Sequence, residues 1–432
     1  MASPERARGW AKSTFASLGN RDYRVLWFGT SLAFLAFMMS WVVQSVVAFD
    51  LTGKNGAVGA VSLGMGVATL AVAPFGGVIA DRVSKRRLLL VGQTVIGLTF
   101  AGVGVLIITG AITVAWLIAS TFVMGVVFSF IAPARQAWIG EILRGPALAN
   151  GIALQQVAMT ATRILGPLLA ALLIAAPGVG TGGTYLAMAA MFVVVVATLA
   201  RLPATKSRGG APTSVLTDLR EGVAHVTGRP RLALLAGTFI AIVITGYSYQ
   251  VVLPGFLENE LGRSSRDLGL LMGVGAVAGL AATLALAGRA GTPRAWDLMF
   301  GGGLLMGASL AWAGLAPNFL HLAAAMFLVG AGTGTFQMLN NALVMREAEP
   351  AYYGRVMSLT MLAWGANGIA GLPFGVLADH IGERATLLAM AAAVVAVTAF
   401  AAAGAGAIGR LQPAHVALPI ADPQEERSLG SS

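Results

Sequence analysis

Twelve long apolar runs follow one another along this chain of 432 residues and leave it few ways to fold. A helix that crosses a bilayer needs about 20 mainly apolar residues, because the hydrocarbon core is about 30 Å thick. Lipid offers no hydrogen-bond partners to the backbone, so each run is expected to be helical. The sequence therefore predicts an all-α membrane protein with twelve transmembrane helices. The predicted spans are residues 25–49, 57–80, 88–109, 113–134, 148–174, 184–202, 232–254, 268–288, 296–315, 319–344, 355–378 and 385–408.

The composition favours a lipid environment and excludes several functions. Hydrophobic residues make up 57% of the chain and charged residues 11%, whereas soluble domains carry about 25% charge. The net charge of +10 is spread between the apolar runs, so no nucleic-acid partner is expected. The chain has no Cys and only four scattered His residues, so it predicts neither a metal site nor a cofactor. Phosphate-binding and nucleophile motifs are missing from the sequence, so no enzyme and no ATP-driven pump are predicted.

The distribution of positive charge predicts the orientation in the membrane. With a cytoplasmic N-terminus, the outer loops receive only Lys54, Arg263, Arg266 and Arg384 of the 28 Lys and Arg residues. Arg163 lies inside a span, and the other basic residues fall on the cytoplasmic side. Because cytoplasmic loops are enriched in Lys and Arg, we expect a multi-pass protein of the cytoplasmic (inner) membrane with both termini in the cytoplasm. Anionic lipid is an expected partner of these loops.

A polar break between the sixth and seventh runs divides the chain into two halves. Its second part has apolar residues at helical spacing, which predicts a flexible link and then an amphipathic helix on the membrane surface. The two halves echo each other weakly, as in transporters built from repeats. The predicted units are an N-terminal six-helix bundle (1–202), the cytoplasmic linker (203–230), a C-terminal six-helix bundle (231–410) and a disordered cytoplasmic tail (411–432).

The loop between the second and third runs carries a family signature. Its sequence from Gly77 to Arg87 resembles the major facilitator pattern G-x-L-A-D-R-x-G-R-[RK], with Ser84 in place of the usual Gly. The resemblance covers about residues 20–410 and implies the major facilitator fold, with two pseudo-symmetric six-helix bundles and a monomeric state. Segments similar to the bacterial exporter branch that includes enterobactin exporters, of the drug and siderophore efflux type, are residues 20–27, 50–53, 133–137, 218–222 and 354–358.

Two positions depart from that family pattern. Many proton-coupled drug exporters carry an Arg early in the fourth helix, where this chain has Ser120, Thr121 and Phe122. The second-half copy of the loop signature, at residues 288–294, has lost its acidic residue, and a better copy at residues 375–382 falls on the outer side.

The resemblance assigns a conformational switch to Gly77, Asp81, Arg82 and Arg86. The Asp81 carboxylate would cap the N-terminus of a neighbouring helix, where its charge meets the helix dipole, and would release it in the other conformation. The alternative for Asp81 is a solvated loop charge. Arg82 and Arg86 either take part in the switch or only fix topology and attract anionic lipid.

Arg163 is the most informative single residue of the sequence. It lies about 15 residues into the fifth span, or about 22 Å along the helix axis. A charge at that depth is costly and usually faces a partner or a water-filled space. It is either an anion-binding or coupling group, or a structural partner for helix dipoles or Gln side chains. Gly166 and Pro167 resemble the helix-five motif of antiporters, with Ala170 and Ala171 where Gly is usual.

Polar and aromatic residues form stripes on four of the predicted helices, and all carboxylates fall at helix ends or in loops. The lack of a buried acid disfavours a cationic substrate and favours a neutral or anionic one. In major facilitators the first, fourth, seventh and tenth helices line the central path, so these stripes are candidates for the substrate cavity. Their alternative role is hydrogen bonding between helices. The candidate cavity residues, in addition to Arg163, are Trp41, Gln44, Tyr247, Gln250, Gln337, Asn341, Trp364 and Asn367.

These observations predict a secondary active transporter that exports a small molecule, drug-like or siderophore-like, by alternating access. The expected coupling ion is the proton, in antiport. An importer or a lysophospholipid flippase on the same fold is the first alternative. A non-transporting receptor or scaffold is the alternative of another class, and it is disfavoured because the chain has no sizeable soluble domain.

Overall fold

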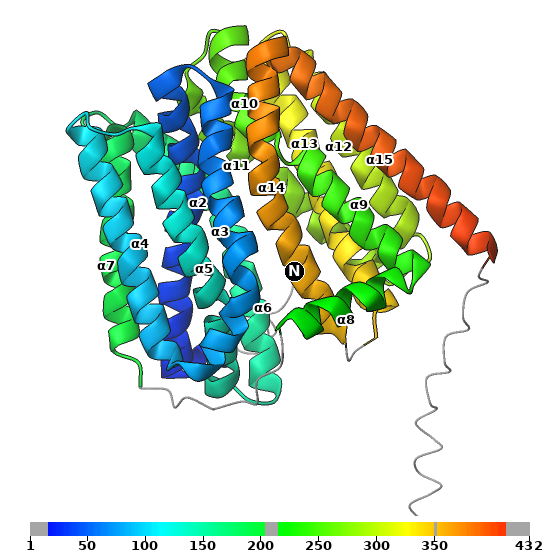
Figure 1. Ribbon diagram of the computed structural model, residues 1–432, viewed down its shortest axis with the longest axis horizontal. Coiled ribbons are helices and arrows are strands. Elements are labelled where there is room, and N and C mark those ends of the chain that lie inside the picture. Colours follow the sequence, from blue (N-terminus) through cyan, green and yellow to red (C-terminus); the bar gives the residue numbers. More distant parts are fainter. Residues whose placement is uncertain (1–15, 204–214, 350–351, 412–432) are drawn as a thin grey trace, which may run out of the picture.

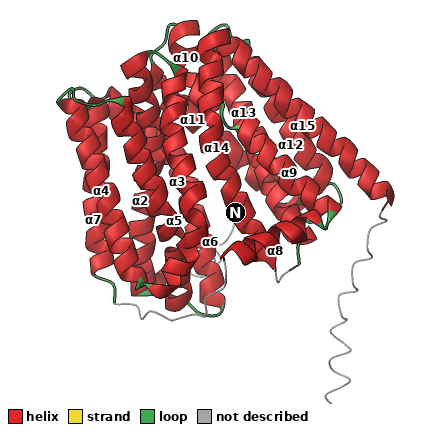
Figure 2. Cartoon of the chain, in the orientation of Figure 1, coloured by secondary structure: helices red, strands yellow, loops and turns green. Residues whose placement is uncertain are grey.

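A computed structural model describes residues 16–203, 215–349 and 352–411. Over these residues the chain is helical and has no β-strand (Figure 1, Figure 2), as the apolar runs predict. The long helical segments are α2 (Arg21–Thr52), α3 (Asn55–Arg82), α4 (Lys85–Ile108), α5 (Val114–Ile142), α6 (Pro146–Ala175), α7 (Gly180–Ala200), α9 (Pro230–Gly246) with α10 (Tyr249–Gly255), α11 (Leu268–Leu286), α12 (Ala295–Gly314), α13 (Phe319–Glu347), α14 (Tyr353–Ile381) and α15 (Glu383–Leu411). The shorter elements are η1 (Ala16–Gly19), α8 (Val215–Thr227), η2 (Phe256–Glu260), η3 (Ser265–Asp267) and η4 (Ala287–Arg289).

Local capping residues set several helix boundaries. The side chain of Asn20 accepts a hydrogen bond from the backbone N–H of Tyr23 at the start of α2. At the start of α13, the side chain of Asn318 accepts one from the backbone N–H of His321. Gly53 ends α2 at a φ of 65°, a left-handed conformation that Gly adopts without strain. Short polar residues and Gly at these points make the turns between spans possible.

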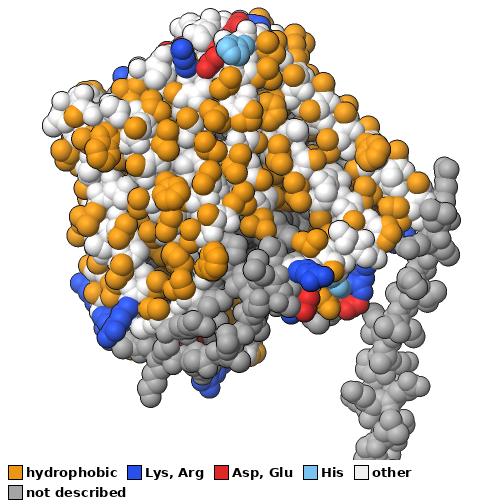
Figure 3. Space-filling view, in the orientation of Figure 1, with side chains coloured by type: hydrophobic (Ala, Val, Ile, Leu, Met, Phe, Trp, Pro, Cys, Tyr) orange, Lys and Arg blue, Asp and Glu red, His pale blue; other side chains and the backbone are white. Residues whose placement is uncertain are grey.

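The surface separates into an apolar band and two charged ends. Figure 3 shows hydrophobic side chains covering the middle of one face, with Lys, Arg, Asp and Glu near its ends. Ten of the helical segments in the described part of the chain are long and apolar enough to cross a membrane. The helices α12 and α14 bring the long helical segments to the predicted twelve. This pattern is that of a multi-pass membrane protein.

The helices pack into two groups, α2 to α7 and α9 to α15, and α8 connects them (Figure 1). Within the first group, the Tyr23 hydroxyl of α2 donates to the carbonyl of Gly151 at 2.6 Å, and the Trp27 indole N–H donates to that of Leu154 at 3.1 Å. These bonds fix α6, which carries Arg163, against α2. We call the end that holds α8 and the start of α2 the linker end, and the opposite end the distal end.

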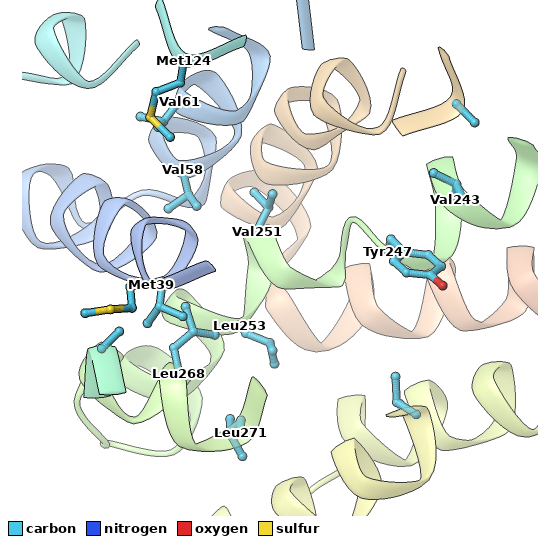
Figure 4. Packing of buried hydrophobic residues seen from close by; sticks show 14 of the residues in the cluster. Met39, Val58, Val61, Met124, Val243, Tyr247, Val251, Leu253, Leu268 and Leu271 are labelled. Carbon is cyan, nitrogen blue, oxygen red and sulfur yellow. The ribbon is translucent and has the colours of Figure 1, made fainter. Parts of the chain in front are cut away.

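The two groups of helices contact each other mainly from the distal end to the middle of the molecule. There α3 packs along α14, and α6 packs along α11. Gly59 allows the first contact, because a Cβ at this position would clash with the carbonyl oxygen of Gly371 and lie 2.6 Å from the Cα of Leu372. Figure 4 shows Met39 of α2, Leu253 of α10 and Leu268 of α11 pointing toward one another, and all three are buried. Apolar packing thus contributes to the distal half of the interface.

Candidate substrate site and gate

Arg163 lies on the face of α6 that is turned toward the other group of helices. One and two turns further along α6, Pro167 and Ala171 pack against Gly269 of α11. Arg163 itself is exposed, and its charge interacts with Tyr247 of the second group. Gln156, also exposed, lies on the same face two turns toward the linker end. Arg163 therefore lies one turn from the part of α6 that packs against α11.

Tyr247 stands at a break in the seventh predicted span. The chain predicts one continuous helix over 232–254, but α9 ends at Gly246 and α10 begins at Tyr249. Gly246 at the break packs closely against Met306 and Val394, where a larger residue would not fit without movement. The Ser248 hydroxyl donates to the carbonyl of Ile244 at 2.8 Å and thereby satisfies one backbone group that the break frees. Discontinuous helices at mid-membrane commonly line transporter binding sites.

The ring of Tyr247 is held by Trp364 of α14. The two rings meet edge to face, with centroids 5.0 Å apart at an interplanar angle of 88°. The Tyr247 hydroxyl is buried and has no hydrogen-bond partner among the residues that the structure describes. A buried hydroxyl without a partner costs about 1–3 kcal/mol. Such a group near an exposed Arg is suited to binding a polar ligand atom.

Asn367 lies one turn beyond Trp364 and supports the break. Its side-chain oxygen accepts a hydrogen bond from the Ser248 hydroxyl at 3.3 Å, and both residues are buried. Tyr249 and Gln250, the first two residues of α10, are both half-buried. Trp364, Tyr247 and Asn367 therefore lie together, although they come from two helices that are far apart in sequence.

The remaining candidates lie on α2 and α13. Trp41 is half-buried, contacts Phe37 edge to face at 6.3 Å, and its indole N–H has no acceptor in the described part of the chain. Gln44, one turn further, is buried. Gln337 and Asn341 are both half-buried on α13. Their roles as cavity residues stay predictions.

This geometry suits recognition of a small polar or anionic molecule rather than catalysis. No group of His, Cys, Asp or Glu side chains within the described ranges could hold a metal ion. A depression of about 450 Å³ on the surface is lined by apolar residues of α11, α12 and α13 such as Trp312 and Phe327, and Arg163 is not among its lining residues. The polar groups of the interface thus form the candidate site.

A family model described as the Major Facilitator Superfamily matches residues 26–372. The chain belongs to this superfamily. It is therefore a multi-pass membrane transporter and not an enzyme, as the sequence predicts. The fold with two bundles related to each other is that of major facilitators, so this resemblance is confirmed.

Known major facilitators with similar sequences include transporters of two kinds. The staphyloferrin A transporter of Staphylococcus aureus (strain NCTC 8325 / PS 47) is 24% identical over 382 residues, which cover 85% of this chain and 93% of the relative. Macrolide efflux protein A of Streptococcus pyogenes is 22% identical over 377 residues, covering 83% and 90%. Among solved structures, a bacterial homolog of the human lysosomal transporter Spinster, inward-facing and unoccupied, has a TM-score of 0.73 at 14% identity, covering 96% of this chain and all of that one.

The predicted major facilitator switch is only partly visible. Gly77, Asp81 and Arg82 occupy the last turns of α3, but their side chains lie outside the described residues. Arg86, the second residue of α4, donates to the carbonyl of Ala200 at the end of α7, at 2.6 Å. Lys85, the first residue of α4, is buried and forms a 2.9 Å ion pair with Glu141 of α5. The loop is thus tied to two helices of its own bundle.

Gly166 and Pro167, the residues of the predicted helix-five motif, lie on α6 and pack against other helices. Gly166 lies against Met38 and Met39 of α2, and a Cβ there would clash with the Met38 side chain. The carbonyl of Pro167 lies against Gly269 of α11, 2.5 Å from where a Cβ at that Gly would be. These two residues let α6 approach one helix of each bundle, while their role in coupling stays a prediction.

A polar cluster that sequence reasoning did not single out joins the bundles at the distal end. The Asp379 carboxylate of α14 accepts hydrogen bonds from the backbone N–H groups of Asn55 and Gly56, at 2.8 and 2.9 Å, where α3 begins. The side chain of Asn55 donates to the buried Glu383 at 2.9 Å and accepts from the N–H of Gly255 at 3.2 Å. We call these five residues the distal latch. Its only signal in the sequence was the copy of the family loop pattern at residues 375–382.

Proposed function

We propose that this major facilitator exports a small neutral or anionic molecule from the cytoplasm across the cytoplasmic membrane, by proton-driven alternating access. The observation that carries the proposal is Arg163: an exposed guanidinium in the middle of a spanning helix, one turn from the part of that helix that packs against the opposite bundle. A charge in that position is costly unless it serves a ligand or a coupling step.

The site favours a ligand that accepts hydrogen bonds. Arg163 offers N–H donors in a planar fork that matches a carboxylate or a phenolate. The Tyr247 hydroxyl and the Trp41 indole N–H are further donors without partners among the described residues. A carboxylate-rich or phenolate-rich chelator would use these groups. The siderophore and macrolide relatives support a substrate of that size, at an identity too low to name it.

The conformation also supports alternating access. The distal latch and the apolar contact around Met39 join the two groups of helices at one end. With the orientation predicted from positive charge, the distal end is external, so this state would receive substrate from the cytoplasm. Asp81, at the opposite end of α3, would close the linker end in the other state, as the family resemblance implies.

Transport in inside-out membrane vesicles tests the proposal. We would impose a proton gradient, acidic inside, and follow uptake of a catecholate siderophore, a polycarboxylate chelator, a macrolide, a cationic dye and a lysophospholipid. The expected result is uptake of an anionic or neutral compound. A protonophore should abolish this uptake, and Arg163→Gln should reduce it at least tenfold. Uptake of lysophospholipid alone would favour a flippase, and accumulation only in right-side-out vesicles would favour an importer. Equal export by Arg163→Gln at equal expression would refute the role of Arg163.

A further inference from the structure

A second buried cation lies within the first bundle and is independent of the candidate site. Positive charge near the linker end predicts a cytoplasmic position for Arg135, but the residue is only 6% exposed within α5. Its guanidinium carbon lies 4.5 Å from the centre of the Phe34 ring of α2. Cation–π contact with one ring only partly replaces the hydration that burial removes.

Among the residues that the structure describes, no acidic side chain neutralises Arg135. Within the described ranges the guanidinium has neither a carboxylate partner nor a hydrogen-bond acceptor, and its enclosed Nε–H is without a partner. The acid at this end of α5, Glu141, is paired with Lys85. Gln93 of α4 is 4% exposed, and its side-chain oxygen also lacks a partner. Two nine-tenths-buried polar side chains from two helices are thus left without protein partners.

Both side chains line the same cavity. It has a volume of about 30 Å³ and is lined by aromatic and aliphatic groups, with Phe34, Phe128 and Phe192 among them. A site of about 10–15 Å³ in this measure holds one water molecule. The cavity therefore has room for one or two atom-sized particles. No carboxylate lines it, so nothing around it would attract a metal cation.

We propose that this cavity is a binding site for a monoatomic halide, with chloride as the ligand. A halide supplies the countercharge that Arg135 lacks and accepts N–H bonds from its guanidinium. The Gln93 amide can present its NH₂ group to the same ion, because no protein partner fixes which end of the amide faces the cavity. Phenylalanine rings carry positive potential at their edges, which also favours an anion beside them. A water molecule would fill the space but would leave the charge unpaired.

Thermal unfolding of the purified protein in detergent tests the site, because a ligand that binds only the folded state raises the Tm in a saturable way. Sodium chloride would replace sodium gluconate at constant ionic strength. We expect chloride and bromide to raise the Tm by several degrees along a saturating curve. Gln93→Glu places a carboxylate next to Arg135, so its Tm without halide should approach that of the wild type in saturating chloride, with no further rise on adding chloride.

Two further variants complete the experiment. Arg135→Gln should lose the saturable response, whereas Arg201→Gln, which removes an exposed cation of the same bundle, should keep it. Equal Tm values in chloride and gluconate for the wild type would overturn the proposal, and so would an unchanged chloride response in Gln93→Glu. The chloride response of Gln93→Glu tests the halide site even if Arg135→Gln fails to fold. None of these measurements depends on transport.

Discussion

Replacing Asp379 with Asn should open the distal end. The carboxylate receives two backbone N–H bonds at the start of α3, and its charge faces the positive end of that helix dipole. Asn keeps one acceptor oxygen and turns an NH₂ group toward the second N–H. A hydrogen bond to a charged group contributes about 1.5–3 kcal/mol when buried, and Asp379 is exposed, which lowers that value. We therefore expect a loss of about 1–2 kcal/mol from the closed state, or a factor of about 5–30 in the conformational equilibrium.

The absence of Cys makes this shift directly measurable. Spin labels on Cys at positions 108 and 315, both highly exposed at the distal ends of α4 and α12, report the distance between the bundles by double electron–electron resonance. Asp379→Asn should increase the longer-distance population. Asp81→Asn should decrease it, since the resemblance implies that Asp81 closes the opposite end, and the double variant should fall between the two.

The matched control is Asp267→Asn. Asp267 is also a carboxylate at the distal end, but it pairs with Arg263 of its own bundle, at 2.8 Å. Its removal should leave the distance distribution unchanged. Identical distributions for the wild type and Asp379→Asn, or an equal shift in Asp267→Asn, would refute the reasoning that Asp379 joins the bundles.

Three further substitutions test other parts of the structure. Gly59→Ala should push α3 from α14 and raise the distal-open population in the same distance measurement, while Gly102→Ala, in open space on α4, should leave it unchanged. Tyr247→Phe removes a buried hydroxyl without a described partner, so we expect a Tm equal to or above that of the wild type; a clear loss of stability would show a partner in the free protein. Arg163→Lys keeps the charge but loses the planar fork, so KM for an anionic substrate should rise about tenfold, with little change in kcat, in vesicle transport assays.

The fold followed from the sequence because lipid allows few solutions. Each apolar run was expected to form a helix, because lipid offers the backbone no hydrogen-bond partners. The distribution of Lys and Arg predicted which loops face the cytoplasm. The break at Tyr247 could not be predicted in this way, because the loss of one helical backbone hydrogen bond does not change the hydropathy of the span. Its chemical signs were Gly246 and Ser248, which fit a break only once Met306 and Asn367 are seen beside them.

The candidate site was predictable only by residue type. Arg163 stood out because a single charge interrupted a span, and the structure leaves its side chain exposed one turn from the α6 residues that pack against α11. The burial of Arg135 was not predicted, because the residue lies near a predicted span boundary, where a cation usually reaches water. Its burial depends on Phe34 and Gln93, which come from two other helices, and such contacts are invisible in one sequence.

The antiparallel packing of α3 and α14 gives the distal latch its place in the transport cycle. Because the two helices run in opposite directions, the C-terminal end of each lies beside the N-terminal end of the other. Asp379 near the end of α14 caps the start of α3 at the distal end, and Asp81 near the end of α3 stands at the same kind of position at the linker end. Rocking of the bundles would separate one pair as it brings the other together, so two similar carboxylates would hold the two states at nearly equal free energy. A transporter needs such a balance, because a state held several kcal/mol deeper than its alternative would stop the cycle.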